Sequence, residues 1–167
     1  MATILYNGRL VLRDNILEQG GVVVEDGKIS RVFTAEFTPS PSDQVIDAAG
    51  RYISPGFIDA HVHGGGGADT MDATEEAIVQ IAETHAKHGM TAFLPTTLTA
   101  SPEAIRKACR AVRNVKICSH RGASVLGIHL EGPFISMKYK GAQNPAYLQA
   151  PSVEAFHTIS DLSLIHI

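Results

Sequence analysis

The sequence predicts an α/β protein in which a β-rich N-terminal part precedes alternating strands and helices. Residues 1–54 contain short apolar and β-branched runs separated by Gly, Asn, Asp and Pro, which is typical of consecutive strands and turns. After Pro55, strand patterns alternate with helix patterns, as in parallel sheets with right-handed crossovers. These patterns alone fit both a doubly wound sheet and part of a (β/α)₈ barrel.

The composition is that of an ordinary globular protein. The 167 residues are 19% charged and 44% hydrophobic, which excludes a disordered chain, a collagen-like fibre and a coiled coil. The formal charge of −3 provides no general attraction for nucleic acid or an anionic membrane. We find no apolar run long enough to span a membrane and no secretory signal pattern. The two cysteines lack zinc or redox spacing, so we expect a cytoplasmic protein.

Two dipeptides predict turns in the N-terminal part. Asn7-Gly8 and Asp26-Gly27 each lie between two apolar runs. A type I′ hairpin turn needs positive φ at both central residues, and these residue pairs adopt it readily. We therefore expect a turn at each pair, followed by further short strands at Val45–Ala48 and Tyr52–Ile53.

The second part is predicted to contain three strands and three helices. In order, they are a strand at 57–63, a helix ending near Gly89, a strand at 91–97, a helix from Pro102, a strand at 124–130 and a short helix after Ser152. Asp72 and Glu75 fit a capping box at the start of the first helix. Pro95 suggests that the second strand ends there, because proline cannot donate to a β ladder.

The pair His61-x-His63 is the first candidate site. Alternate residues of a strand point to one face, so both imidazoles project the same way, and Asp59 shares that phase. Two neutral imidazoles can chelate a divalent metal. The pair stands at the C-terminal end of a strand beside Gly64–Gly67, glycines that leave room for a ligand. The same pattern also fits two histidines in an edge strand or a turn.

Glu131 is the second candidate. It follows an apolar strand and precedes Gly132-Pro133. A carboxylate there is costly to bury unless it is paired or bound to a cation, although a helix cap or a surface turn would also explain it. His129 shares its phase and could support a ligand or contact a substrate. The loop Gly141–Pro145 could bind sugar hydroxyls or phosphate, or could be an ordinary turn.

Two kinds of functional site have motifs that this sequence lacks. The chain has neither GxxxxGK[ST] nor GxGxxG, which argues against nucleotide binding at the glycine run. It also lacks GxSxG, the nucleophile motif of α/β-hydrolases.

The segment 55–63, PGFIDAHVH, resembles the first barrel strand of the amidohydrolase superfamily. Four further segments resemble the N-acetylglucosamine-6-phosphate deacetylase family within it: the glycines 64–67, TAFLPT at 91–96, GIHLEGPF at 127–134 and KGAQNP at 140–145. The resemblance runs from about Ile4 to about Pro151, which is nearly the whole chain.

The resemblance implies an incomplete (β/α)₈ TIM-type barrel preceded by part of a small β-sandwich domain. Residues 1–54 would be the N-terminal part of the accessory domain, and 55–167 the first three to four β/α units of the barrel. About 112 residues follow Pro55, whereas a complete barrel needs roughly 250. The ending, 160–167, does not resemble the next segment of the family, so we expect a truncated chain.

The activity implied by the resemblance is metal-dependent hydrolysis of N-acetyl-D-glucosamine 6-phosphate to D-glucosamine 6-phosphate and acetate, in amino-sugar catabolism. Glu131 matches the family's metal-binding glutamate. His61 and His63 match a His-x-His pair that some members use for a second metal, whereas other members carry a pair there that does not bind metal. Ala142 and Gln143 fall where the family contacts the amino sugar. Most members have histidine where this chain has Gln143, so that contact is expected to be altered.

The implied cofactor is a divalent metal, Zn, Fe or Mn, since nitrogen and oxygen ligands suit all three. In the family, two further metal histidines and the catalytic aspartate lie on later strands. No catalytic residue is therefore assigned in this chain, and we expect the chain alone to be inactive. The full-length enzyme would be a homo-oligomer acting on a small amino-sugar phosphate. Two alternatives stay open: another amidohydrolase, such as a dihydroorotase-like or allantoinase-like enzyme, or a non-catalytic fragment.

Overall fold

A computed structural model describes residues 1–34 and 37–160 of the chain. The chain divides into two compact units, Met1–Pro55 and Gly56–Ile167. Within the described ranges, the helices are all too short or too polar to cross a membrane. The unusual ending at 161–167 lies outside the described residues.

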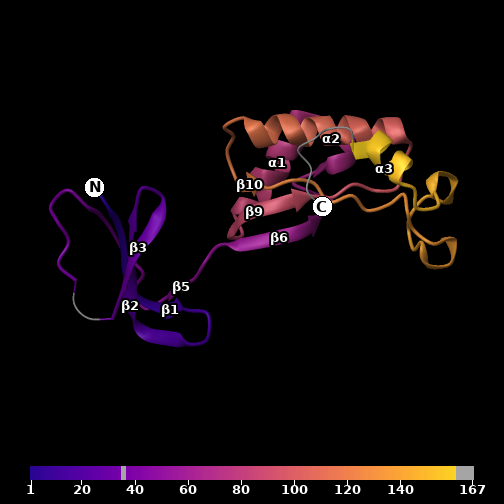
Figure 1. The fold of residues 1–167 in the computed structure, drawn as a ribbon. Helices are drawn as coiled ribbons and strands as arrows, with labels where there is room; N and C mark the ends of the chain where they lie inside the picture. Colours follow the sequence, from indigo (N-terminus) through magenta and orange to yellow (C-terminus); the bar gives the residue numbers. More distant parts are fainter. Residues whose placement is uncertain (35–36, 161–167) are drawn as a thin grey trace. The chain divides into compact units, whose positions relative to one another are not determined.

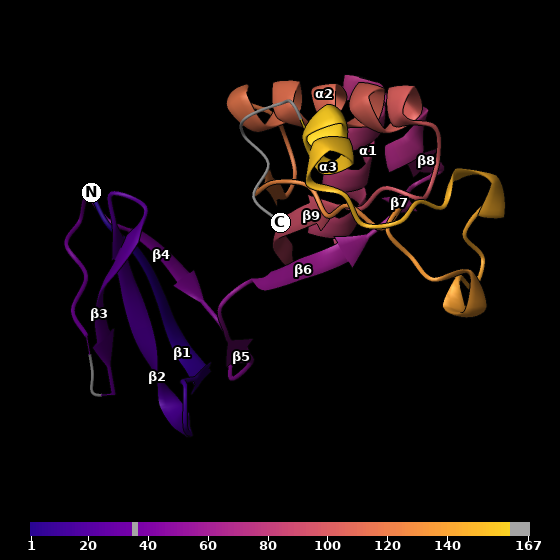
Figure 2. The same ribbon diagram turned by 45° about the vertical axis from the view of Figure 1, so that its right-hand side comes forward.

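The first unit is a five-stranded sheet with the order β3-β2-β1-β4, in which β5 also pairs with β1. Figure 2 shows these strands. Their bounds are β1 Thr3–Val11, β2 Ile16–Glu25, β3 Lys28–Phe33, β4 Gln44–Asp47 and β5 Tyr52–Ile53. The antiparallel β1–β2 and β2–β3 pairs come from consecutive segments, whereas β4 and β5 run parallel to β1. A small core forms where Ala2, Ile4 and Val23 pack together.

The turn predicted at Asp26-Gly27 is confirmed. Both residues have positive φ, 49° and 73°, and they connect the antiparallel strands β2 and β3. Glu25 pairs with Lys28 across the turn, so this is a two-residue hairpin loop.

The turn predicted at Asn7-Gly8 is wrong, because both residues lie inside β1. Between the pairs Leu5–Val22 and Gly8–Gly20, two residues of β1, Tyr6 and Asn7, lie opposite one residue of β2. The extra residue forms a bulge, at which Asn7 has φ 55°. The Asn7 amide donates to the Asp47 carboxylate at 2.8 Å. The backbone N–H of Ala49, which donates to the same carboxylate, and this bond from Asn7 both lower the pKa of Asp47. A tertiary contact therefore stabilises a conformation that the dipeptide would otherwise use for a hairpin.

The second unit combines a parallel sheet with helices on one side of it (Figure 1). The sheet order is β10-β9-β6 and both pairings are parallel. The main elements are β6 Phe57–Val62, α1 Glu75–Ala86, β9 Met90–Pro95, α2 Pro102–Ile117, β10 Ser124–Val125 and α3 Val153–Ser160. Shorter elements are β7 Gly64–Gly65, β8 Ala68–Asp69, η1 Thr70–Asp72, η2 Met137–Tyr139 and η3 Pro145–Tyr147. The predicted mixed α/β class is confirmed, and over the described residues these strands do not close a barrel.

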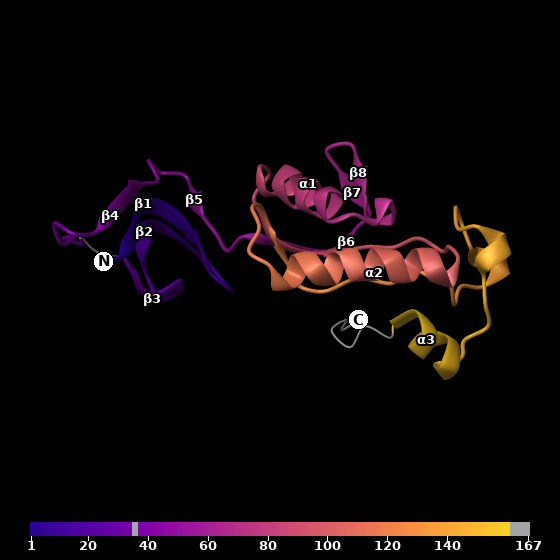
Figure 3. The ribbon, with the colours of Figure 1, turned by 90° about the horizontal axis from the view of Figure 1, so that it is seen from above.

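The core of this unit lies between the sheet and the helices. Figure 3 shows α2 flanked by α1 and α3. Apolar residues recur at intervals of three and four along α1 and α2, which puts them on the side that faces the sheet. The fully buried side chains of this core include Ile78, Ile81, Phe93, Ile105, Val112, Ile128 and Ile159.

The predicted capping box at Asp72 and Glu75 is displaced in the structure. The box instead joins Asp69 and Asp72 around the short helix η1. Thr74 caps α1, and its hydroxyl accepts from the backbone N–H of Ala77 at 3.2 Å. The sequence thus contains two successive helix caps: the first, at Asp69, starts the short helix η1, and the second, at Thr74, starts α1.

The strand predicted at 124–130 is shorter than expected, since only Ser124–Val125 forms a regular strand. Leu126 still donates to Phe93, and His129 donates to the carbonyl of Pro95 at 3.0 Å. Between these two bonds the ladder would need an N–H from Pro95, which proline lacks. The isolated parallel bridge between Thr96 and His129 resumes the pairing beyond that break.

The hydroxyl of Thr96 repairs a second irregularity, between β6 and β9. It accepts from the buried backbone N–H of Val62 at 2.9 Å and donates to the carbonyl of Leu94 at 3.2 Å. The hydroxyl thus bridges two backbone groups where the register of the two strands shifts. The neighbouring hydroxyl of Thr97 is buried and has no hydrogen-bond partner among the described residues.

Replacing Thr96 with Val should destabilise the chain by about 1–3 kcal/mol, because the buried N–H of Val62 loses its acceptor. The matched replacement Thr97→Val removes a hydroxyl that has no hydrogen-bond partner in the described part of the chain, and should be neutral or stabilising. Urea unfolding midpoints of both variants and the parent measure the difference. Equal destabilisation by the two substitutions would contradict the role given to Thr96.

The two cysteines should differ sharply in reactivity. Cys109 is fully buried, and burial raises the pKa of its thiol from 9.0 to about 11, whereas Cys118 is exposed. A disulfide reagent at pH 8 should therefore modify one thiol in the folded chain and two in urea. Between pH of about 9 and about 11 the folded chain keeps a proton that the unfolded chain has released, so stability should fall across that window. Rapid modification of both thiols under native conditions would show that this core is not closed.

Candidate metal centre

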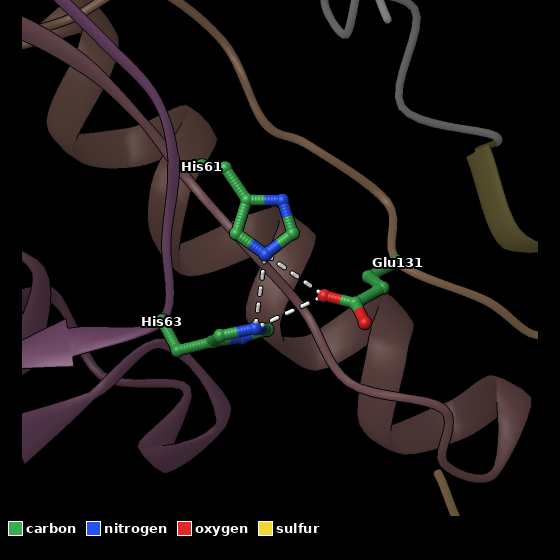
Figure 4. A group of neighbouring side chains, drawn as sticks. All are labelled: His61, His63 and Glu131. Carbon is green, nitrogen blue, oxygen red and sulfur yellow. Dashed lines mark hydrogen bonds and ion pairs between the residues drawn. The ribbon is translucent and has the colours of Figure 1, made fainter. Parts of the chain in front are cut away.

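Three side chains converge at the C-terminal ends of the parallel strands: His61, His63 and Glu131 (Figure 4). The Nε2 atoms of the two histidines lie 3.2 Å apart, and each lies 3.0 Å from Oε2 of Glu131. His61 belongs to β6 and His63 follows it directly, while Glu131 follows the bridge at His129. Alternation along the strand and the shared edge of a parallel sheet therefore bring together all three predicted ligands.

The ring of His63 is held by the neighbouring strand. Its Nδ1 lies 3.1 Å from the carbonyl of Thr96, a group that can only accept. The carbonyl therefore favours the proton on Nδ1, which leaves the Nε2 lone pair directed at Glu131. The backbone of His63 is fixed as well, since its carbonyl accepts from both the N–H and the hydroxyl of Thr70, at 2.7 and 2.8 Å.

His61 is bounded by His129. The two rings meet edge to face with centroids 4.7 Å apart, and Nδ1 of His129 lies 2.9 Å from the carbonyl of Ala60. His129 is thus tied to the strand that carries His61. Asp59, which shares the phase of the histidines, instead accepts the backbone N–H of His61 at 2.9 Å and is not part of the three-residue group.

Glu131 provides the test of whether a cation fits this group. Its Oε2 is buried and has no hydrogen-bond partner among the described residues, although two ring nitrogens lie 3.0 Å away. The nitrogen of His63 can present a lone pair there, so the contact is not a donor–acceptor pair in that tautomer. A divalent cation between the three atoms would satisfy the carboxylate and the imidazoles together.

The spacing of the three atoms also suits a small cation. Zinc–nitrogen and zinc–oxygen bonds of about 2.0–2.1 Å in a tetrahedron separate ligand atoms by roughly 3.3 Å. The observed separations in the group are 3.0 and 3.2 Å. Two imidazoles and one carboxylate suit Zn, Fe or Mn and provide no basis for choosing among them.

The glycine run beside the histidines has a local structural explanation. Gly64–Gly65 and Ala68–Asp69 form a small hairpin, whose turn residues Gly66 and Gly67 have φ of 65° and 87°. A Cβ at Gly65 would lie 2.6 Å from Nε2 of His85, and that nitrogen lies 3.1 Å from the carbonyl of Gly64. The glycines are thus required by the turn and by His85, which anchors the hairpin to α1.

The two predicted substrate residues differ in exposure. Ala142 is exposed on the loop, whereas Gln143 is 5% exposed and both ends of its amide are engaged. Its Oε1 accepts from the backbone N–H of Thr99, and its Nε2 donates to Oε1 of Glu131, both at 2.7 Å. Gln143 therefore touches the carboxylate of the candidate centre directly.

Sequence reasoning did not identify the groups that hold the candidate ligands in place. The hydroxyl of Thr70 donates to the carbonyl of His63, and the carbonyl of Thr96 lies beside the ring of His63. The backbone N–H of Thr99 donates to the side chain of Gln143. The available signal was the cluster of threonines directly after Pro95, at the end of a buried strand. A side chain that bonds to a neighbouring backbone has no spacing rule by which sequence alone could have assigned its partner.

The amidohydrolase family model matches residues 52–163 of the chain. The N-acetylglucosamine-6-phosphate deacetylase of Mus musculus is 37% identical over 158 residues, which are 93% of this chain and 37% of that protein. The predicted resemblance to this group of deacetylases is therefore confirmed as homology over most of the chain.

Solved structures of such deacetylases are also similar to this chain. The N-acetylglucosamine-6-phosphate deacetylase from Pasteurella multocida superposes with a TM-score of 0.87 at 29% identity, over 99% of this chain and 43% of that one. A D267A mutant from Mycobacterium smegmatis, in complex with N-acetyl-D-glucosamine-6-phosphate, gives 0.80 at 26% identity, over 96% and 40%. The chain thus spans about two fifths of the length of these relatives. On the family match and these likenesses, the chain belongs to the amidohydrolase family.

Proposed function

We propose that this chain supplies metal ligands to the active site of an enzyme that hydrolyses N-acetyl-D-glucosamine 6-phosphate to D-glucosamine 6-phosphate and acetate. The observation that carries the proposal is the convergence of His61, His63 and Glu131 at one edge of the parallel sheet. The homology to deacetylases and the sugar phosphate bound to one of them support this substrate. Because the chain spans only part of those relatives, the proposal concerns the complete active site to which these residues would belong.

The proposed cofactor is one divalent cation, held by Nε2 of His61, Nε2 of His63 and Oε2 of Glu131. Such a cation, when bound, polarises an amide carbonyl and acidifies water. Glu131 contributes the negative charge of the group, and the two imidazoles contribute neutral donors. The carbonyl of Thr96 keeps the proton of His63 on Nδ1, so that Nε2 is free to bind.

We assign the amino sugar to the side of the centre formed by the loop at Ala142 and Gln143. Ala142 is exposed there and its small side chain leaves space for a sugar ring. Nε2 of Gln143 carries a second hydrogen beside the one given to Glu131, and that hydrogen is the group we assign to substrate. No proton transfer is assigned to the described residues, because the family resemblance puts the catalytic aspartate on a later strand.

Metal binding tests the first half of the proposal. Titration calorimetry with Zn²⁺ should show one site per chain, and Co²⁺ should give a visible absorption band from the same site. Glu131→Gln and His63→Gln should each weaken Zn²⁺ binding strongly. The loss should exceed the factor of about 10–100 that is typical when a residue hydrogen-bonded to a metal ligand is replaced. His88→Gln is the matched control, because His88 is an exposed histidine in the turn just after α1. Binding that is unaffected by both ligand substitutions would place the metal elsewhere.

Activity tests the second half. Purified chain 1–167 with added Zn²⁺ or Fe²⁺ should release no acetate from the sugar phosphate, because three ligands without a proton donor do not complete the proposed site. A chimera in which residues 1–160 replace the matching segment of the Pasteurella multocida deacetylase should release acetate, and Glu131→Gln in that chimera should abolish it. Turnover by the chain alone comparable with a full-length relative would overturn the first expectation. A folded, metal-binding chimera that hydrolyses dihydroorotate or allantoin instead would overturn the substrate assignment.

A further inference from the structure

A single side-chain amide connects three segments around the candidate centre. Gln143 lies in the loop before η3, Thr99 in the loop after β9, and Glu131 after the bridge at His129. The amide of Gln143 bonds to the other two at 2.7 Å on each side. These are the shortest hydrogen bonds that Gln143 makes, and its side chain is 5% exposed.

The orientation of this amide follows from its partners. The backbone N–H of Thr99 can only donate, so the atom that faces it must be the amide oxygen. The NH₂ group is then obliged to face Glu131, whose ionised carboxylate can only accept. An inverted amide would set two donors against each other on one side and two acceptors on the other. The arrangement therefore has a single consistent assignment.

The backbone around the amide is held close by glycine. Gly132 has φ 87°, and a Cβ there would lie 1.9 Å from the hydroxyl of Thr99. The segment that carries Glu131 thus packs directly on the segment that anchors Gln143. On its own loop, Gln143 donates its N–H to the carbonyl of Lys140, and the ammonium group of Lys140 donates back to the carbonyl of Gln143 at 3.2 Å. Gln143 is consequently fixed at its backbone and at both ends of its amide.

The carboxylate of Glu131 is divided between two tasks. Oε1 accepts from Gln143, whereas Oε2 is buried, accepts no hydrogen bond among the described residues and lies 3.0 Å from both histidine nitrogens. A carboxylate whose two oxygens were both free could turn about its last torsion and present either one or both to a cation. The bond from Gln143 removes that freedom.

We propose that Gln143 is a positioning residue that makes Glu131 a one-oxygen ligand, with Oε2 alone directed to the cation and Oε1 retained by the amide. This inference rests on the proposed function, since it assumes the cation held by the two histidines and Glu131. A neutral amide suits this role because it donates to the carboxylate without adding charge to the pocket. Gln143 acts through Glu131, so the effect of its replacement should appear first in metal affinity.

The experiment compares the parent chain with Gln143→Met, Gln143→His and Gln149→Met. Methionine matches glutamine in length but has no hydrogen to donate to Glu131. Histidine restores a donor and an acceptor on one side chain. Gln149→Met is the matched control on the same stretch of loop. Among the described residues, Gln149 forms a hydrogen bond through its backbone N–H alone, to the carbonyl of Pro133. Zn²⁺ affinity, the Co²⁺ absorption spectrum and the unfolding midpoint of the metal-free chain are measured for each.

We expect Gln143→Met to weaken Zn²⁺ binding about 10- to 100-fold and to shift the Co²⁺ band, while Gln143→His recovers affinity and Gln149→Met matches the parent. Parent-like Zn²⁺ affinity in Gln143→Met, with only the unfolding midpoint lowered, would reduce Gln143 to a packing role and overturn the proposal. Failure of the parent itself to bind metal would instead refute the proposed function, and this inference with it.

Amide hydrogen exchange gives a readout that needs no metal. In the metal-free parent, the backbone N–H of Thr99 should exchange slowly because it is bonded to Oε1 of Gln143. Exchange should accelerate in Gln143→Met and slow again in Gln143→His. Fast exchange of this N–H in the parent would show that the amide is not held as described, and would overturn the positioning role independently of the metal titration.

Discussion

The parallel pairing of β6 with β9 is the constraint on which the candidate centre depends. His61 and His63 share a face only because the strand alternates, and a slip of one residue would turn both imidazoles away. The register is kept at an irregular point, where the hydroxyl of Thr96 joins the N–H of Val62 to the carbonyl of Leu94. The backbone carbonyl of the same residue orients the ring of His63. One threonine therefore links strand register to the direction of a candidate ligand.

The carboxylate and the imidazoles are held by different parts of the chain. The histidines are held by the backbone of their strand. In addition, Thr70 bonds to the carbonyl of His63, and the ring of His129 packs edge to face against that of His61. Glu131 is fixed from the side, by the amide of Gln143. Between these supports, the buried Oε2 of Glu131 lies 3.0 Å from two ring nitrogens and has no hydrogen-bond partner among the described residues. A bound cation is the group that would make this arrangement favourable.

In this member of the amidohydrolase family, the candidate ligands gather at the C-terminal edge of the parallel sheet. In folds built from parallel strands, sites form at the C-terminal edge, where the loops are free to vary above a packed core. The described residues supply that edge with three candidate ligands and with the loop at Gln143, and they span about two fifths of the relatives compared. The helices pack against one face of the sheet, and the apolar core lies between them and the strands.

The sequence by itself determined the types and order of the main elements, the hairpin at Asp26-Gly27 and the two histidines on one face, because these follow from local periodicity and turn chemistry. The motifs around Glu131 also identified the family. The tertiary structure alone decided that Asn7-Gly8 would be a bulge, that the strand after Ser124 would break opposite Pro95, and that Gln143 would bond to Glu131. Each of these outcomes depends on a partner distant in sequence, and local patterns carry no information about which distant group will meet a given backbone or side chain.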